Sequence, residues 1–61
     1  MPVVKIDMWD GRTDEQKSEI IKGITEVFEK QGVSKEKTTI IINEVKKNNW
    51  GLNGDLASKN D

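Results

Sequence analysis

The sequence predicts an α+β fold: a single β-α-β unit with a parallel strand pair, followed by a C-terminal β-hairpin. Three observations carry this prediction. Apolar residues alternate over residues 2–9, a capped amphipathic helix spans residues 14–31, and a β-branched run covers residues 38–45. Strand, helix and strand in that order imply that the strands pair in parallel, with the helix as the crossover. The 61 residues allow one domain, residues 1–61.

The first strand has one strongly apolar face and one mixed face, because side chains alternate with period two. The apolar face carries Val4, Ile6 and Met8, and the mixed face carries Val3, Lys5, Asp7 and Trp9. Pro2 stands at the start, where its missing N–H costs the strand little. Asp10-Gly11 ends the strand.

The helix is delimited by signals at both ends. Thr13 and Gln16 have the spacing of a capping box, and Gly32 is a typical C-terminal stop. Between them, apolar residues recur at helical spacing and predict one apolar stripe. The stripe consists of Ile20, Ile21, Ile24, Val27 and Phe28.

The remainder of the chain predicts a second strand and a short hairpin. Residues 38–45 are rich in β-branched side chains, which favour a pleated surface. Polar connections are expected at residues 33–37 and 46–49. Residues 50–56 are expected to turn at Asn53-Gly54, a strong hairpin signal. Residues 58–61 are expected to fray.

This architecture predicts self-association. One helix covers one face of a two-stranded sheet, and two strands alone are marginal in water. A chain this short buries only about 60% of the surface that its unfolded form exposes, and it has no cysteine for a disulfide. We therefore expect the sheets to join across subunits, with the hairpin acting as a clip onto a neighbour.

Composition argues against several classes of protein. Ten basic and eleven acidic residues give a net charge of −1, which disfavours nucleic-acid and polybasic membrane binding. No apolar run approaches the roughly 20 residues of a membrane helix, and no signal peptide is visible. Histidine and cysteine are absent, so no metal site is expected. The expected location is the cytoplasm.

Pro2 and Arg12 are the strongest candidates for chemistry. Removal of Met1 would leave Pro2 with a secondary amine, and an apolar environment lowers the pKa of an amine by disfavouring its cation. Such an amine can act as a general base or a nucleophile. Arg12, the only arginine, offers a bidentate fork for a carboxylate. The alternative for Pro2 is a residue that simply begins a strand, and the alternative for Arg12 is a solvated surface cation.

Trp9 and Trp50 are expected in the core or in an interface more often than in the wall of a substrate site.

Several segments together resemble the 4-oxalocrotonate tautomerase family. They are Pro2 after Met1, the run Asp10-Gly11-Arg12-Thr13-Asp14-Glu15-Gln16-Lys17, Ile41-Ile42-Asn43-Glu44, Trp50-Gly51 and Leu56-Ala57-Ser58-Lys59. The resemblance covers nearly the whole chain. It implies a β-α-β monomer assembled as a homohexamer, a trimer of dimers, and a cytoplasmic isomerase of aromatic degradation.

The resemblance also implies a chemistry. Family members interconvert keto and enol forms of unsaturated 2-oxo acids without metal or cofactor. Pro2 would carry the proton between two carbons and Arg12 would hold a substrate carboxylate. Trp50, Leu52 and Trp9 match apolar pocket walls.

The sequence departs from the family at one position. Members that act on dicarboxylates have a second arginine near the start of the second strand, where this chain has Thr39 after a loop one residue shorter. Lys37, two residues earlier, is expected on the same strand face and could supply a cation, but not a rigid fork. Beside an active tautomerase that acts on a different acid, the departure leaves the alternative of a homo-oligomer with little or no catalysis. A separate alternative is a DNA-binding ribbon-helix-helix dimer, which has a similar length and consists of one strand and two helices. The three consecutive isoleucines with flanking threonines and the few cations of the strand argue against it.

Overall fold

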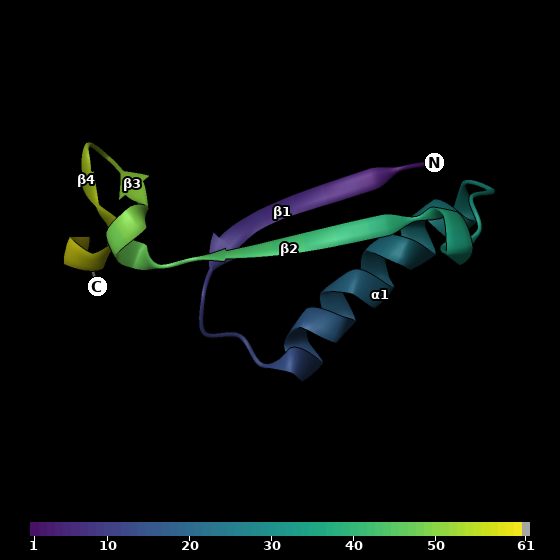
Figure 1. Ribbon diagram of the computed structural model, residues 1–61, viewed down its shortest axis with the longest axis horizontal. Helices are drawn as coiled ribbons and strands as arrows, with labels where there is room; N and C mark the ends of the chain where they lie inside the picture. Colours follow the sequence, from purple (N-terminus) through teal and green to yellow (C-terminus); the bar gives the residue numbers. More distant parts are fainter. Residues whose placement is uncertain (61) are drawn as a thin grey trace.

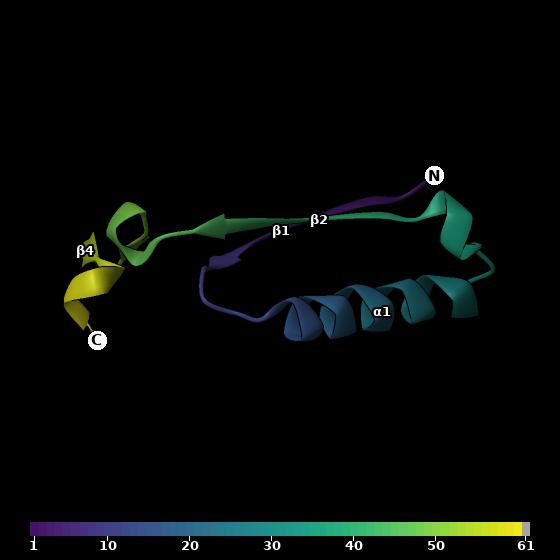
Figure 2. The ribbon, with the colours of Figure 1, turned by 60° about the horizontal axis from the view of Figure 1, so that its bottom comes forward.

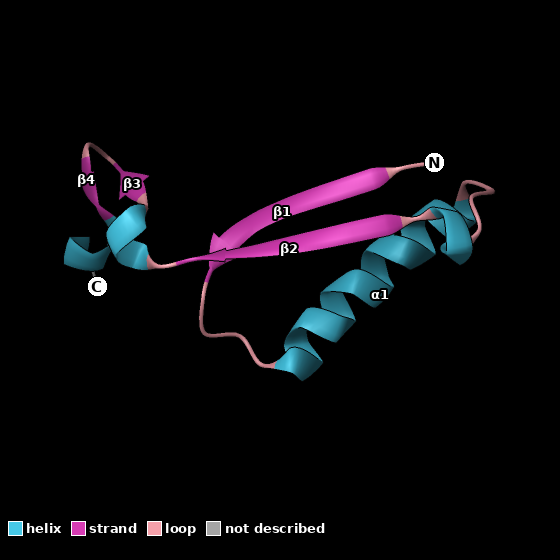
Figure 3. Cartoon of the chain, in the orientation of Figure 1, coloured by secondary structure: helices cyan, strands magenta, loops and turns pink. Residues whose placement is uncertain are grey.

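The computed structural model describes residues 1–60 and has the predicted order of elements (Figures 1 and 3). The main elements are β1 (Val3–Trp9), α1 (Asp14–Lys30), β2 (Thr39–Val45), β3 (Gly51–Leu52) and β4 (Asp55–Leu56). Three 3₁₀ turns complete the chain, at Lys35–Lys37, Lys47–Asn49 and Ala57–Asn60. The α+β prediction is confirmed. Because residues 39–45 form a strand, the ribbon-helix-helix alternative, which needs a second helix there, is wrong.

The two long strands pair in parallel over their full length. The register runs from Val3 opposite Thr39 to Trp9 opposite Val45. Backbone hydrogen bonds extend the ladder at both ends, from Thr39 N to Pro2 O at 3.0 Å and from Asp10 N to Val45 O at 3.2 Å. Both strand termini are therefore fixed relative to each other.

The helix begins and ends where its capping signals lie. The Thr13 side chain accepts from Gln16 N at 3.1 Å, and the Gln16 side chain accepts from Thr13 N at 3.0 Å. At the other end Gly32 adopts a φ of +88°, a left-handed conformation that suits glycine. Gly32 N and Val33 N donate to carbonyls of the last helical turn.

Helix α1 covers one face of the sheet, as the edge-on view shows (Figure 2). The half-buried residues of this layer come from both strands and from the helix, namely Val4, Ile6, Met8, Ile40, Ile42, Ile20, Ile24 and Phe28. The apolar stripe that the sequence predicts for the helix is wider than the part of α1 that packs against the sheet. Ile21 and Val27 remain 39% and 58% exposed, because they lie at the edges of the stripe and two strands are too narrow to reach them.

The opposite sheet face is not covered by α1, and among the described residues it is in contact with the rest of the chain only at its Trp9 end. It carries Val3, Lys5, Asp7, Trp9, Thr39, Ile41, Asn43 and Val45, and we call it the bare face. Ile41 on this face is 46% exposed. The bare face is the mixed face that the alternation of the first strand predicts.

Residues 46–60 form a C-terminal arm that projects beyond the end of β2 (Figure 1). Its hairpin turns at Asn53-Gly54, where φ is +55° and +79°, as a two-residue hairpin of this kind requires. The expected fraying of residues 58–61 is wrong for the described part. Ala57–Asn60 forms a 3₁₀ turn because Ala57 is buried and Lys59 lies 3.6 Å from Asp55. Asp61 lies outside the described residues.

The chain is elongated and has little interior of its own. Its radius of gyration is 14.5 Å, whereas a compact domain of this length would have about 10.5 Å. Among residues 1–59 only Ala57, with 2% exposure, is fully buried. Nearly all the apolar side chains that the sheet and helix bring together are thus half-buried at most.

Candidate active site

Pro2 lies at the start of β1, at the end of the sheet marked N in Figure 1. It is half-buried and held by the hydrogen bond between its carbonyl and Thr39 N. Met1 ahead of it is 90% exposed. The bond that joins Met1 to Pro2 therefore stands at an open end of the sheet, next to a fixed backbone.

Thr39 lies beside Pro2 at the same end of the sheet, whereas Lys37 lies in a turn and not on the expected strand. Thr39 is exposed and lies on the bare face, opposite Val3. Lys37 belongs to a 3₁₀ turn, and its N–H donates to Ser34 O at 3.0 Å. Strand alternation therefore does not extend back to Lys37, and the expectation that Lys37 shares a strand face with Thr39 is wrong.

Trp9 and Trp50 meet at the opposite end of the sheet. Their ring centroids are 5.9 Å apart and their planes make an angle of 75°, the edge-to-face geometry that aromatic pairs favour. Both side chains are half-buried. Leu52, in β3 of the same arm, is 44% exposed. These three residues provide an apolar surface at this end of the chain.

Arg12 lies in the loop between Trp9 and the helix. Gly11 before it has a φ of +113°, so this turn needs a residue without a side chain. The Arg12 side chain is exposed, and within residues 1–60 it makes no hydrogen bond or ion pair. Its guanidinium is therefore available to an outside carboxylate.

One chain does not bring all these residues together. The seven steps from Pro2 to Trp9 along a strand span about 23 Å at ~3.3 Å per residue. Pro2 and Thr39 lie at one end of the sheet, while Trp9, Trp50 and the Arg12 loop lie at the other (Figure 1). The described residues enclose no pocket. A small molecule cannot touch both groups of one chain at once.

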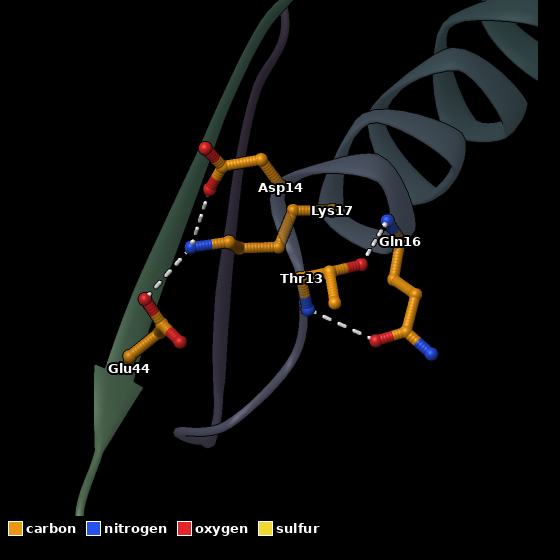
Figure 4. A network of polar contacts seen from close by, with 5 residues as sticks. All are labelled: Thr13, Asp14, Gln16, Lys17 and Glu44. Carbon is orange, nitrogen blue, oxygen red and sulfur yellow. Dashed lines mark hydrogen bonds and ion pairs between the residues drawn. The ribbon is translucent and has the colours of Figure 1, made fainter.

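A polar network ties the start of α1 to the end of β2 (Figure 4). Lys17 Nζ donates to Glu44 Oε1 at 2.9 Å and lies 3.6 Å from Asp14 Oδ1. The hydrogen bond to Glu44 raises the pKa of Lys17 above its ordinary value of 10.5, and the charges of Glu44 and Asp14 act in the same direction. The network fixes the helix start, and with it the loop that carries Arg12.

The described part of the chain contains neither a metal-binding group nor a membrane-spanning helix. Residues 1–60 contain no group of three or more side chains suited to hold a metal ion. No helix among them is long and apolar enough to cross a membrane.

Comparisons with known proteins give a consistent answer. A family model described as tautomerase enzyme matches residues 2–60. The chain is 42% identical over 59 residues to 2-hydroxymuconate tautomerase of Bacillus subtilis, covering 95% of each chain. The chain belongs to the tautomerase family. Membership supports keto–enol tautomerase chemistry, which is an isomerisation.

Solved structures of tautomerases share the fold. A 4-oxalocrotonate tautomerase isozyme from Methylibium petroleiphilum superposes with a TM-score of 0.85 and 38% identity, covering 93% of this chain and 94% of that one. A heterohexameric 4-oxalocrotonate tautomerase from Chloroflexus aurantiacus gives 0.87 and 27%, covering 97% of each. The predicted family and fold are thus confirmed, and the relatives of this chain include a hexamer.

Sequence reasoning missed one residue at the tryptophan end of the sheet. Lys47 Nζ lies 4.6 Å from the centroid of the Trp9 ring. The only signal is a lysine three positions before Trp50 in a stretch that favours a tight turn, which is too weak to single it out.

Proposed function

We propose that this chain is a cofactor-independent keto–enol tautomerase that acts on a small unsaturated 2-oxo or 2-hydroxy acid. The carrying observation is the position of Pro2. The family match begins at this residue, which stands half-buried at the start of β1 behind an exposed Met1. Removal of Met1 converts the Pro2 amide into a secondary amine at a fixed place.

In the proposed reaction the neutral Pro2 amine takes a proton from one carbon of the substrate and returns it to another. Arg12 binds the substrate carboxylate through its two parallel N–H groups. Trp9, Trp50 and Leu52 form an apolar wall that keeps water away and so favours the neutral amine. These roles agree with the exposure of the side chains in one chain. Arg12 and Leu52 are exposed and can be reached by a substrate, and Pro2, Trp9 and Trp50 are half-buried.

The proposal includes a homo-oligomer, with a homohexamer as the expected form. Two observations support it. The two groups of site residues lie at opposite ends of the sheet, and the bare face leaves apolar residues in water. A neighbouring copy that brings its tryptophan end to the Pro2 end of the first would complete the site. The hexameric relative from Chloroflexus aurantiacus has the same fold.

The substrate class follows from the departure at Thr39. A threonine hydroxyl donates one neutral hydrogen bond, whereas an arginine provides a charged fork. Lys37, from its 3₁₀ turn near the same end, is the candidate for a replacement cation. We therefore propose a preference for monocarboxylate over dicarboxylate substrates. The proposal includes a cytoplasmic location, which the composition also favours, and a role in aromatic degradation, which the family resemblance implies.

The second candidate is an assembly with little catalysis. It is favoured by the same Thr39, because loss of about 3 kcal/mol of electrostatic help to a developing enolate slows a reaction about a hundredfold. An activity measurement separates the two functions.

The test compares two forms of one sequence. The protein is purified once with Met1 removed and once from cells in which methionine aminopeptidase is inhibited, and intact mass verifies each form. Ultraviolet absorbance then follows ketonisation of enol-phenylpyruvate and 2-hydroxymuconate. We expect both forms to fold alike and only the processed form to be active. Equal activity would show that the Pro2 amine is not the base, and no activity in either form would favour the second candidate.

A further inference from the structure

Lys47 contacts both members of the tryptophan pair. It begins the 3₁₀ turn Lys47–Asn49 that leads from β2 into the arm, and its side chain is half-buried. Its ammonium lies over the Trp9 ring, 4.6 Å from the centroid. Its carbonyl accepts from Trp50 N at 3.3 Å. One residue therefore joins the end of the sheet to the arm, through its side chain and its backbone.

The Trp9 indole has few other directional contacts. Its Nε1 is buried and has no hydrogen-bond partner within residues 1–60. Its orientation is therefore determined by ring packing on Trp50 and by the ammonium over its face. A cation at this distance is attracted by the negative face of the ring and favours one tilt of the indole over others.

Trp50 is held mainly through its backbone. Its carbonyl accepts from Ala57 N at 2.8 Å, next to the buried Ala57. These backbone bonds of Trp50 do not use the Lys47 ammonium, which contacts the Trp9 ring. The fold of the arm and the orientation of Trp9 are therefore different properties. The two properties can be measured separately.

We propose that Lys47 is a positioning residue that sets the angle between Trp9 and Trp50. Insofar as this pair forms the wall of the substrate site, the consequence for catalysis rests on the proposed function. Lys47 does not contact the substrate in this proposal. It affects substrate binding by holding the Trp9 ring at a fixed angle to Trp50, and the two rings contact the substrate.

The chain offers a spectroscopic test because Trp9 and Trp50 are its only tryptophans. Two indoles at 5.9 Å and 75° couple their electronic transitions, so the full-length protein should show an exciton couplet in circular dichroism. Trp9→Phe and Trp50→Phe identify the couplet by abolishing it. The test variant is Lys47→Met, whose unbranched side chain is one atom shorter than that of lysine and carries no charge. The matched control is Lys46→Met, at the exposed neighbour.

We expect Lys47→Met to reduce the couplet, Lys47→Arg to retain it because guanidinium also stacks on indole, and Lys46→Met to leave it unchanged. Sedimentation and helix content verify that each variant is folded and assembled. Lys47→Gln serves as a second neutral variant if Lys47→Met does not fold. A couplet unchanged in a folded neutral variant, or lost equally in Lys47→Arg, would overturn the proposal.

Activity provides the second readout. In an active enzyme Lys47→Met should lower kcat/KM about two- to fivefold, the size expected of one cation–π contact. The loss should appear in KM, with the pH profile of the Pro2 amine unchanged. If the native protein is inactive, the proposed function fails while the couplet still decides the role of Lys47. A normal kcat/KM in a folded variant with a weakened couplet would show that this angle does not matter to the substrate.

Discussion

Asn43 Nδ2 donates a 2.9 Å hydrogen bond to Asp7 Oδ1 across the parallel strands. The two residues are direct register partners, so this bond lies in the middle of the bare face. Ile41 stands next to it on β2, and Val3 lies further along the same face; they are 46% and 54% exposed. The bare face therefore combines a satisfied polar pair with apolar side chains, which is the composition of a surface that packs against protein.

The first prediction concerns assembly. Ile41→Asp should shift the protein towards smaller species, because a buried carboxylate without a partner costs several kcal/mol. Analytical ultracentrifugation at micromolar concentration measures this shift. Lys35→Asp, in an exposed turn, is the control and should leave the native assembly intact. A folded native monomer at this concentration would refute the proposed oligomer.

The second prediction concerns Arg12. Arg12→Ala should raise KM and lower kcat, reducing kcat/KM about ten- to hundredfold, as expected for a lost hydrogen bond between charged groups. Arg12→Lys should recover only part of the loss, because lysine lacks the planar fork. Steady-state kinetics on enol-phenylpyruvate provides the measurement. An unchanged KM would place the carboxylate elsewhere.

The third prediction concerns substrate preference. We expect the native protein to favour a monocarboxylate, such as 2-hydroxy-2,4-pentadienoate or enol-phenylpyruvate, over 2-hydroxymuconate. A second carboxylate would have to be desolvated without a bidentate partner. Thr39→Arg should raise kcat/KM for the dicarboxylate selectively, and Thr39→Val is the control for loss of the hydroxyl. If the native protein prefers the dicarboxylate and Thr39→Arg changes nothing, another group such as Lys37 already fills this role.

The fourth prediction is a pH dependence of stability. Because Glu44 raises the pKa of Lys17 in the folded chain, the stabilisation is complete below about pH 10 and is lost as the pH rises through the raised value. The difference in free energy of unfolding between native protein and Lys17→Met should therefore be constant from pH 8 to about 10 and shrink above it. Urea titrations measure it, with Lys22→Met as the exposed control. A difference that grows at high pH would contradict the assignment.

The long elements could be predicted because their signals are local. Thr13 and Gln16 define the start of the helix through two hydrogen bonds, and Gly32 defines its end through a backbone conformation. The β-branched residues 39–45 favour a strand whatever surrounds them. The turn at Asn53-Gly54 likewise depends on the conformational freedom of two residues.

The 3₁₀ turns and the contacts between ends could not be predicted in this way. A three-residue turn has too few residues for a periodic signal, so the sequence alone places Lys37 on a strand face that it does not share. The order of the turn at Ala57–Asn60 depends on the burial of Ala57, a tertiary effect. The contact of Lys47 with Trp9 joins residues 38 positions apart and has no local signature.

The sheet keeps Pro2 and the Arg12 loop at opposite ends of each copy (Figure 1). In the proposed assembly, two different defects can therefore compensate for each other. A chain with a blocked Pro2 amine and an Arg12→Ala chain, denatured and refolded as a mixture, would form some sites that take an intact residue from each parent. The activity of the refolded mixture would then exceed the summed activity of the two parents. In a cell with two different gene copies, one active site would likewise combine residues encoded by both copies.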